Sequence, residues 1–498
     1  MKRYRLEIIV FITGAVVMAL ELVGSRIVAP YLGTSIYVWT SLIGVILGSL
    51  SLGYYWGGYL ADKKPDYRIF SILILSSAIL TGIIGLIKTP VLDAVIRFIP
   101  DIRISAVIAA TLLFAPAGTL LGTISPYAIR LRMKDLEHSG ATVGRLYAIS
   151  TVGSIIGTFA AGFFLISFFG SRNILLLLSM TLFCVYFLAS SGTGSRSLKT
   201  TAIIFIVMLL TAFFSRNSNA DKSIVDLDTN YSRVIIEEMQ DSETSKKVRF
   251  IRVDRRWAQG AVVIGEPDKL FFDYSGFYRL AEHFNPGNKK ALLLGGGVYT
   301  LARDYISRNP GGLIDVVEID PEFTSLAKEY FYLIDHPGIK SIHEDGRTFL
   351  NHEKSKYDLI FIDVFKSSAS PPFHMTTVET IKSAYDLLNE NGVVITNIYS
   401  AIHGPKGKFF RAAYATIKSV FPQVYVFPAK YPLYGEEPQN VIVVAMKSSS
   451  PPSMTSSNPE MQKYLSHLWK YKIDCDLPIL TDEFAPVEHY LVEVVKDF

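Results

Sequence analysis

The stretch ALLLGGGVYTLARDYISRNPGGLIDVVEID, residues 291–320, decides how the second half of this chain folds. Residues 291–294 form a short apolar run, and Gly295, Gly296 and Gly297 follow at once. A second apolar run, 314–319, ends in acidic residues. The pattern predicts a strand, a glycine turn, a helix and a second strand. Glu318 lies about 20 residues beyond the glycines, the spacing at which a carboxylate meets ribose hydroxyls in nucleotide-binding βαβ units. The alternative is an ordinary tight turn in an α/β domain.

The composition indicates a membrane protein. Of 498 residues, 50% are hydrophobic and only 19% are charged, and the mean hydropathy is +0.30. These values are high for a soluble protein. The net charge of +4 includes no basic block with interleaved aromatic residues, so we expect no nucleic-acid partner. Cys184 and Cys475 lack metal-ligand spacing, so neither a disulfide framework nor a metal site is expected.

The first part of the chain, residues 1–214, is predicted to be a transmembrane helical bundle. Its apolar segments each approach the roughly 20 residues that cross a bilayer as a helix. We count about seven such segments, at 6–24, 37–60, 69–87, 104–129, 142–169, 173–191 and 200–214. Glycines four residues apart, which let membrane helices pack closely, occur as Gly44/Gly48, Gly53/Gly57, Gly118/Gly122 and Gly153/Gly157.

Glu21 and Arg26 are ionisable residues near the end of the first predicted helix, with Pro30 just beyond them. Charged groups in such helices are costly unless they face protein or water. One interpretation is an ion pair that fixes the helix, and this is the one we favour. The other is a polar cavity that admits a charged substrate or headgroup.

The second part of the chain contains two further regions. Residues 215–285 begin with a polar linker and continue with strand-like runs at 231–237, 247–253 and 261–264, which predict a small antiparallel sheet. Residues 286–498 alternate strands and helices, as in a Rossmann-like α/β domain of the methyltransferase type.

Three acids follow three successive strands of the predicted parallel sheet. They are Glu318, Asp345 and Asp363. Because the carboxyl ends of parallel strands meet at one edge, these side chains and the glycine turn should surround a single crevice. A lone acid in such a position is often only a helix cap, and Asp345, which precedes Gly346, has even odds of that role. Three acids together with three glycines favour a nucleoside pocket.

Two long motifs in the first half resemble a known family. They are ALELVGSRIVAPYLGTSIYVWTSLIGVILGSLSLGYYWGGYLADK at 19–63 and GRLYAISTVGSIIGTFAAGFFLISFFG at 144–170. Both are similar to the membrane half of the membrane-integrated spermidine synthase-like proteins, in which a polytopic bundle is fused to a polyamine aminopropyltransferase domain. The resemblance implies a membrane-bound transferase that moves an aminopropyl group from decarboxylated S-adenosylmethionine to an amine such as putrescine. Its partners would be the lipid bilayer and a small amine, with a second copy of the chain as a further candidate.

The resemblance also implies a role for individual residues, with no permanently bound cofactor and the adenosyl donor as co-substrate. Asp363 matches the catalytic aspartate, which takes a hydrogen bond or a proton from the attacking amine. The donor-binding positions are Gly295, Gly296 and Gly297 beside the sulfonium, Glu318 at the ribose, Asp345 at the adenine and Gln259 as a binding glutamine. Tyr274 and Tyr431 match tyrosines that line the amine channel.

The sequence departs from the family pattern at two acidic positions. Val298 and Tyr299 follow the three glycines where soluble spermidine synthases have Asp-Gly, and Lys366 stands where they have a second aspartate. These differences keep two alternatives open: a methyltransferase that uses S-adenosylmethionine on a membrane-associated substrate, and a non-enzymatic polyamine transporter or sensor. Near the C-terminus, Asp482 and Glu483 could return an acid to the pocket, but we favour Thr481 or Asp482 as the cap of a last helix with Pro486 in its first turn.

The orientation in the membrane rests on two conflicting arguments. In a seven-helix arrangement, one side, which should be cytoplasmic, holds Lys2, Arg3, Arg5, Lys63, Lys64, Arg68, Arg130, Arg132, Lys134, Arg196 and Lys199. An odd number of helices then puts the second half outside, where the adenosyl donor is not expected, and the polar segment 90–104 is a poor eighth crossing. We expect a multi-pass cell-membrane protein with a cytoplasmic catalytic domain, on chemical grounds.

Overall fold

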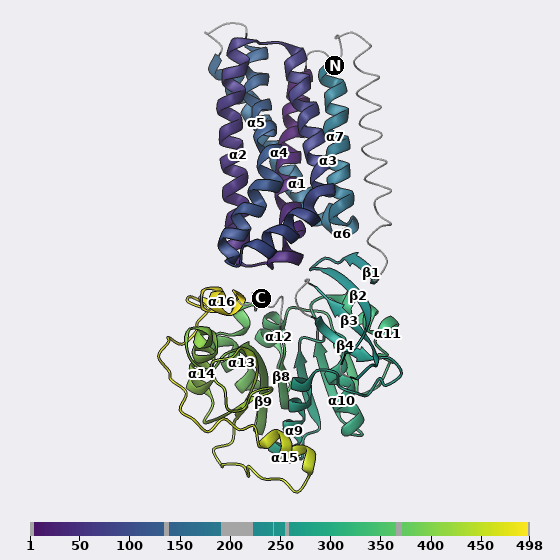
Figure 1. The fold of residues 1–498 in the computed structure, drawn as a ribbon, viewed down its shortest axis with the longest axis vertical. Helices are drawn as coiled ribbons and strands as arrows, with labels where there is room; N and C mark the ends of the chain where they lie inside the picture. Colours follow the sequence, from purple (N-terminus) through teal and green to yellow (C-terminus); the bar gives the residue numbers. More distant parts are fainter. Residues whose placement is uncertain are drawn as a thin grey trace. The chain divides into compact units, whose positions relative to one another are not determined.

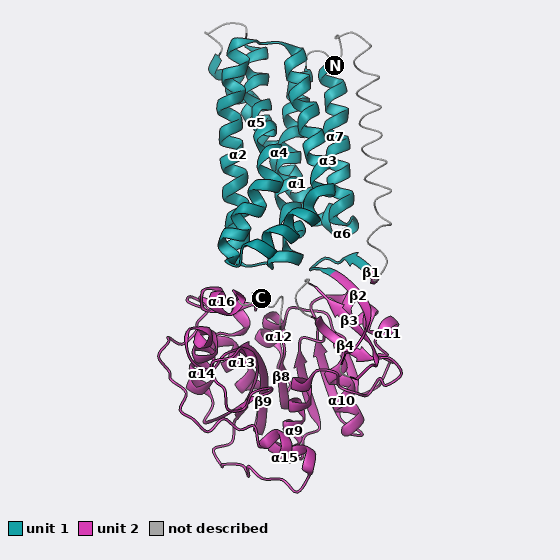
Figure 2. Ribbon diagram, in the orientation of Figure 1, with its two compact units in different colours: residues 1–222, 226–233 teal, residues 223–225, 234–498 magenta. Residues whose placement is uncertain are grey.

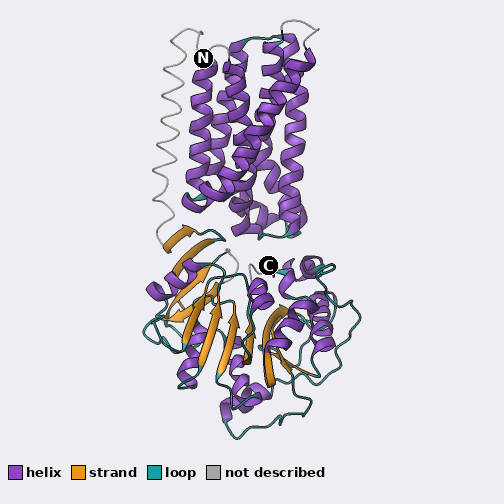
Figure 3. Ribbon diagram, turned by 180° about the vertical axis from the view of Figure 1, so that it is seen from behind, coloured by secondary structure: helices purple, strands orange, loops and turns teal. Residues whose placement is uncertain are grey.

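The computed structural model describes residues 4–133, 139–190, 223–242, 244–253, 258–364 and 371–496. The chain divides into two compact units (Figure 2). Unit 1 comprises Met1–Lys222 and Asp226–Arg233, and unit 2 comprises Ser223–Val225 and Val234–Phe498. The described part of unit 1 is helical apart from its short strand segments, and unit 2 is built around β-sheet (Figure 3). This confirms the predicted fold class of a helical bundle followed by a small antiparallel sheet and a Rossmann-like domain.

The helices of unit 1 are long and apolar (Figure 1). They are α1 (Arg5–Leu32), α2 (Ile36–Lys63), α3 (Tyr67–Phe98), α4 (Ile102–Arg132), α5 (Ser139–Ala160), which continues through the π-helical segment η2 (Ala161–Leu165) into α6 (Ile166–Phe168), and α7 (Ser171–Ser190). Six described helices are long and apolar enough to cross a membrane, judged by length and composition. The seventh expected segment, 200–214, lies outside the described residues. Segment 90–104 forms no helix of its own, because α3 continues through Pro90 to Phe98 and α4 begins at Ile102.

Glycines bring two pairs of helices into backbone contact. Gly53 and Gly57 of α2 pack against the backbone of α4 around Gly122 and Thr123, and Gly153 and Gly157 of α5 pack against Phe11 and Ala15 of α1. A side chain at these glycines would collide with the neighbouring helix. Gly44 and Gly48 differ from the prediction, because open space surrounds both positions in the described structure.

The favoured ion pair between Glu21 and Arg26 does not form. Arg26 donates a hydrogen bond to the backbone carbonyl of Asn230, which also belongs to unit 1. Glu21 is half-buried, and none of the hydrogen bonds or ion pairs of the described residues involves its carboxylate. The prediction of a structural pair was therefore wrong.

A small antiparallel sheet precedes the main sheet. Its order is β1 (Ser223–Asp228), β2 (Arg233–Gln240), β3 (Lys247–Arg252) and β4 (Ala258–Val263). The prediction anticipated β2, β3 and β4 but placed the start of β1 in the linker. Next come the 3-10 helix η4 (Asp273–Arg279) and α9 (Leu280–Phe284).

The main sheet of unit 2 has seven strands in the order β10-β11-β9-β8-β5-β6-β7. The strands are β5 (Lys290–Leu294), β6 (Leu313–Val317), β7 (Ile339–Ile342), β8 (Tyr357–Ile362), β9 (Leu388–Ser400), β10 (Gln423–Pro428) and β11 (Gln439–Met446). Strands β5 to β9 are parallel to one another, whereas β11 runs antiparallel to both β9 and β10. The sheet is therefore mixed. The alternation of strands and helices in the sequence predicted its parallel part but not its antiparallel edge.

Helices cover both faces of this sheet because its central strands are apolar on both sides. Ile360 and Ile362 of β8 pack in the core with α12 (Gly346–His352), α13 (Val378–Leu387), α14 (Lys408–Val420) and α16 (Val487–Val495). Phe361 points the other way, to Tyr278 of η4 and Tyr305 of α10 (Thr300–Arg308). The remaining helical elements are α11 (Pro321–Tyr330), η5 (Phe373–Met375), η6 (Pro405–Gly407) and α15 (Pro459–Leu465).

Candidate active site

The glycine turn lies directly against the end of β8. Gly295 and Gly297 have φ values of 91° and 50°, in the left-handed region that favours glycine. Gly295 donates a hydrogen bond to the Val317 carbonyl over 2.9 Å, and a Cβ on Gly295 would collide with the backbone carbonyl of Asp363. The turn and the catalytic candidate Asp363 are therefore adjacent by backbone contact.

Glu318 braces the same turn from β6. Its Oε2 accepts a hydrogen bond from the Gly297 N–H over 2.9 Å, and its Oε1 accepts one from the Asp320 N–H over 3.1 Å. Burial raises the pKa of this carboxyl, and the two backbone donors oppose that effect. A carboxylate held in this way next to a left-handed glycine is suited to meet a vicinal diol, as in nucleoside binding.

Asp363 is the most chemically distinctive acid of the group. Burial raises its pKa from 3.8 to about 6, while hydrogen bonding by Tyr278 and Asn397 acts in the opposite direction. The Asn397 amide donates to Oδ1 over a long 3.4 Å. The Tyr278 hydroxyl affects Asp363 but is buried without a hydrogen bond of ordinary geometry. We therefore regard this contact as close and weak, and the carboxylate as under-solvated.

Tyr274 joins this cluster. Burial raises the pKa of its phenol and that of Tyr278 well above the ordinary value, and the negative charge of Asp363 adds to both. Both rings come from η4, one turn apart. Tyr274 and Tyr278 therefore both lie close enough to Asp363 to sense its charge.

Asp345 caps α12. Its Oδ1 accepts a hydrogen bond from the Thr348 N–H over 3.0 Å, and its Oδ2 lies 3.6 Å from Nε2 of His374. The capping alternative is therefore present in the structure. The Oδ2 atom faces a histidine ring and not a backbone donor, so capping leaves that oxygen for a further hydrogen bond.

Gln259 and Tyr431 lie in different surroundings. Gln259 belongs to β4. Its backbone carbonyl oxygen would be 4.0 Å from a Cβ on Gly297, so β4 runs beside the glycine turn. Tyr431 follows β10 with a half-exposed ring that packs edge-on against Tyr434, and its backbone is held by Gln439. Among the described residues, Tyr431 makes no hydrogen bond to Asp363.

Two neighbours of Asp363 were missed by the sequence analysis. Tyr278 stands four residues after Tyr274, so helical spacing could have placed both rings on one face. Asn397 lies in β9, which pairs with β8 in parallel. Only the strand order brings it beside Asp363, and no local pattern in the sequence marks it.

Of the three residues that depart from the family pattern, the structure describes Val298 and Tyr299. Val298 is 3% exposed and packs against Gly260 of β4, so an apolar contact replaces the acid there. Tyr299 takes a left-handed φ of 62°, and its buried hydroxyl lies 2.8 Å from that of Thr324. Lys366 lies outside the described residues.

Asp482 binds the start of α12 and caps no helix. Its carboxylate pairs with Arg347 over 2.7 Å and accepts a hydrogen bond from the Thr377 hydroxyl over 2.7 Å. The last helix, α16, has Pro486 as its N-cap residue and no side-chain cap. The favoured cap was therefore wrong, because a tertiary partner for Asp482 could not be seen in the local sequence.

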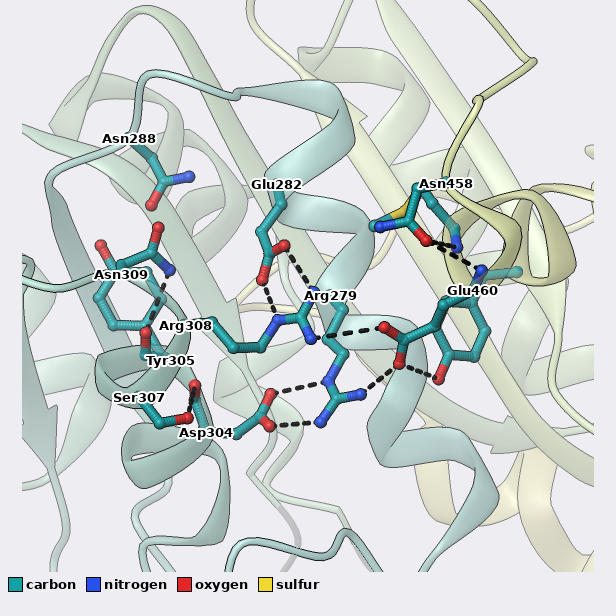
Figure 4. Close-up of polar contacts among 12 residues, drawn as sticks. Arg279, Glu282, Asn288, Asp304, Tyr305, Ser307, Arg308, Asn309, Asn458 and Glu460 are labelled. Carbon is teal, nitrogen blue, oxygen red and sulfur yellow. Dashed lines mark hydrogen bonds and ion pairs between the residues drawn. The ribbon is translucent and has the colours of Figure 1, made fainter.

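A charged network holds η4 to the helix that follows the glycine turn (Figure 4). Arg279, the last residue of η4, forms two hydrogen bonds to Asp304 of α10, of 2.6 and 3.1 Å, and pairs with Glu460 of α15. Arg308 of α10 contacts the same Glu460 over 3.4 Å and forms a bidentate pair with Glu282. Since η4 carries Tyr274 and Tyr278, this network fixes their distance from the glycine turn.

The fold and these side chains define a class of protein: an α/β domain in which Glu318 braces a glycine turn and a carboxylate of raised pKa lies beside that turn. Residues 276–457 match the spermine/spermidine synthase domain, so the C-terminal part of this chain carries a transferase domain of that kind. The match starts inside η4 and ends before α15.

Several curated relatives carry the name polyamine aminopropyltransferase. The protein from Alkaliphilus metalliredigens is 27% identical over 179 residues, which cover 35% of this chain and 62% of the relative. The protein from Vibrio vulnificus is 26% identical over 57% of this chain and 97% of the relative. Polyamine aminopropyltransferase 1 from Streptomyces coelicolor is 24% identical over 434 residues, covering 81% of this chain and 77% of the relative. That alignment is longer than unit 2 and includes helical sequence.

Among solved structures, a probable spermidine synthase from Corynebacterium glutamicum is 23% identical, with a TM-score of 0.40 over 48% of this chain and 85% of that chain. A similarity at this level carries no argument about function.

Proposed function

We propose that this protein is a membrane-bound polyamine aminopropyltransferase that moves an aminopropyl group from decarboxylated S-adenosylmethionine to a small amine such as putrescine. The proposal rests on the raised pKa of Asp363 and on its position beside the glycine turn. Asp363 is a carboxylate with a pKa of about 6, in backbone contact with a left-handed glycine turn that Glu318 braces.

The reaction needs little from the protein beyond orientation and a proton acceptor. The amine nitrogen attacks the carbon next to the sulfonium and a C–N bond forms. The C–S bond breaks, its electron pair goes to sulfur, and methylthioadenosine leaves as a neutral thioether. The proton released from nitrogen passes to Asp363. An acceptor with a pKa of about 6 takes this proton more readily at neutral pH than an exposed carboxylate with its ordinary pKa.

The other residues divide between donor and acceptor. The turn of Gly295, Gly296 and Gly297 lies along the sulfonium, Glu318 holds the ribose and the free oxygen of Asp345 meets the adenine. Gln259, beside the turn on β4, contacts the donor. On the acceptor side, Tyr274 and Tyr431 line the approach of the amine to Asp363, and binding in this crevice supplies proximity.

The direct test is a product assay on the purified full-length protein in detergent. With putrescine and decarboxylated S-adenosylmethionine it should yield methylthioadenosine, and Asp363→Ala should abolish the product. Asp335→Asn is a matched control, because this acid is exposed and, among the described residues, pairs only with Lys328. Full turnover by Asp363→Ala would refute the mechanism.

A second donor in the same assay addresses the alternative chemistry. Val298 gives the end of the glycine turn an apolar contact where soluble relatives of the family have an acid. If the transferred group is methyl, S-adenosylmethionine will yield S-adenosylhomocysteine and the decarboxylated donor will not yield methylthioadenosine. That result would replace the aminopropyl proposal.

Light scattering of the same sample tests for a homodimer.

The membrane orientation is part of the proposal, and two arguments oppose each other. Asp228 and Asn230 contact Ser171 and Arg26, at the end of the bundle away from its basic helix termini. The positive-inside rule alone would put that end outside. We nevertheless propose a multi-pass protein of the cell membrane with a cytoplasmic unit 2, because the adenosyl donor is made inside cells.

The native cysteines allow this orientation to be measured. Cys475 is exposed in unit 2, and the other cysteine, Cys184, lies in the apolar helix α7. A membrane-impermeant maleimide should label Cys475 only after cells are permeabilised, and Cys475→Ser should remove the signal. Labelling of Cys475 in intact cells would overturn the cytoplasmic placement.

A further inference from the structure

Glu21 is a half-buried carboxylate in the middle of α1, and it has no charged partner among the described residues. It is 16 residues after Arg5 and 11 before Leu32, the first and last residues of α1. At 1.5 Å per residue these separations are roughly 24 and 16 Å, so the carboxylate is far from both helix ends. The Glu21 carboxylate forms no hydrogen bond or ion pair with any of the described residues. An ionisable group at such a depth is costly and marks a functional position more often than a structural one.

The contacts of neighbouring residues show which helices Glu21 faces. Gly14, two turns earlier on the same side of α1, touches the backbone of Ser150 in α5. Gly24, one turn later, packs on the ring of Phe114 in α4, and a Cβ there would lie 3.2 Å from Cζ of that ring. Glu21 lies between these two positions along α1. Its position on α1 therefore lies at the junction of α1, α4 and α5.

The seam between α1 and α5 leads to a π-helical segment at this level. Gly153 packs on Phe11 and Gly157 on Ala15, so the two helices run parallel with a constant offset. The same offset places Glu21 opposite the π-helical segment η2 (Ala161–Leu165), where the Ile166 N–H donates to the Ala161 carbonyl. Such π-helical turns are frequent at functional sites. The regular helix is thus interrupted in α5 where α1 carries its unpaired carboxylate.

We propose that Glu21 binds an alkylammonium ion at this junction. A primary ammonium neutralises the carboxylate, and its alkyl chain suits the apolar side chains of the bundle core. A metal ion fits less well, since such ions need several oxygen ligands and no group of three acidic, histidine or cysteine side chains occurs in the described part of the chain. This site is separate from the crevice in unit 2 and does not depend on the transfer reaction.

The test measures binding of radiolabelled putrescine to the full-length protein in detergent, with Asp363→Asn in every sample to remove the carboxylate of the other candidate amine site. The Asp363→Asn protein should bind putrescine, and adding Glu21→Gln should weaken that binding at least about tenfold, as expected for loss of a close charge pair. Glu7→Gln is the matched control, because Glu7 is the other carboxylate of α1 and is paired with Arg132 and Arg145 over 3.4 and 3.7 Å. It should retain the binding.

Two outcomes overturn the proposal. One is equal putrescine binding with and without Glu21→Gln, and the other is no binding by the Asp363→Asn protein. If Glu21→Gln lowers the melting temperature too far for binding to be measured, Glu21→Asp decides, because it keeps the charge and should retain measurable binding. Loss of binding in a folded Glu21→Asp protein counts against an ion pair. Absence of methylthioadenosine in the product assay would leave this test unaffected.

Discussion

Replacing Asp363 with Asn should abolish turnover and, at the same time, make the folded protein more stable above about pH 7. The reason is that burial raises the pKa of this carboxyl from 3.8 to about 6, so the fold disfavours the charged form that accepts the proton. Asn keeps the size and hydrogen-bonding shape of the side chain but carries no charge. The substitution therefore removes the cost of the buried charge along with the proton acceptor.

The size of the effect follows from the pKa values. The folded protein binds the Asp363 proton more tightly than the unfolded chain, so this group's contribution to stability is complete below about pH 4 and is lost as the pH rises through about 6. A pKa raised from 3.8 to about 6 corresponds to about 3 kcal/mol at pH 8. By about pH 5 the difference between Asn and Asp should be roughly half as large.

Thermal unfolding of the purified protein in detergent measures this difference. At about pH 8 the Asp363→Asn protein should melt about 5 °C or more above the wild type, with a smaller gap at about pH 5. Wild-type turnover should rise with pH through about 6, because only the carboxylate accepts the proton. The exposed Asp335→Asn should change neither the melting temperature nor the turnover. Equal melting temperatures for Asp363→Asn and wild type at both pH values would refute the argument that burial of this charge is costly.

Three further substitutions test the surroundings of the site. Asn397→Ala removes a donor that lowers the pKa of Asp363, so the acid limb of the pH–rate profile should move to higher pH; an unmoved limb would show that the 3.4 Å contact has no effect. Glu318→Gln should raise the KM for the adenosyl donor at least about tenfold with a smaller change in kcat, and an unchanged donor KM would exclude a ribose contact. Arg279→Ala leaves the buried carboxylate of Asp304 unpaired and should cost about 3 kcal/mol by thermal unfolding, whereas Arg279→Lys should cost less; equal losses would mean that the bidentate geometry is unimportant.

Features encoded by adjacent residues were predictable from the sequence. An apolar run followed at once by three glycines leaves few conformations other than a strand and a tight turn, and the structure has β5 ending at Leu294. Glu318 and Asp363 follow directly from the strand assignments, since parallel strands end at one edge. The long apolar segments of the bundle are equally local, because their length alone matches the thickness of a bilayer.

Features that depend on which elements become neighbours were not predictable. Asn397 reaches Asp363 only because β9 pairs with β8, and Asp482 meets Arg347 only because the C-terminal segment returns to α12. Glu21 and Arg26 have the sequence spacing of a pair, but Arg26 bonds instead to Asn230, more than 200 residues away. A sequence pattern lists the candidates for an interaction, and competing partners in the folded chain decide among them.

The structure changes the interpretation of Val298. In the sequence it is a missing acid and hence an argument against a cationic transferred group. In the structure its side chain packs on Gly260 beside Ile251, so an aspartate there would lie against apolar atoms. Under the proposed function, discrimination between the two donors would fall to Asp363, beside the glycine turn. The donors differ by one carboxylate, which Asp363 would repel, and like-charge contacts of this kind exclude a wrong partner as effectively as attraction selects the right one. Under the proposed function, this repulsion would favour the decarboxylated donor even without an acid at position 298.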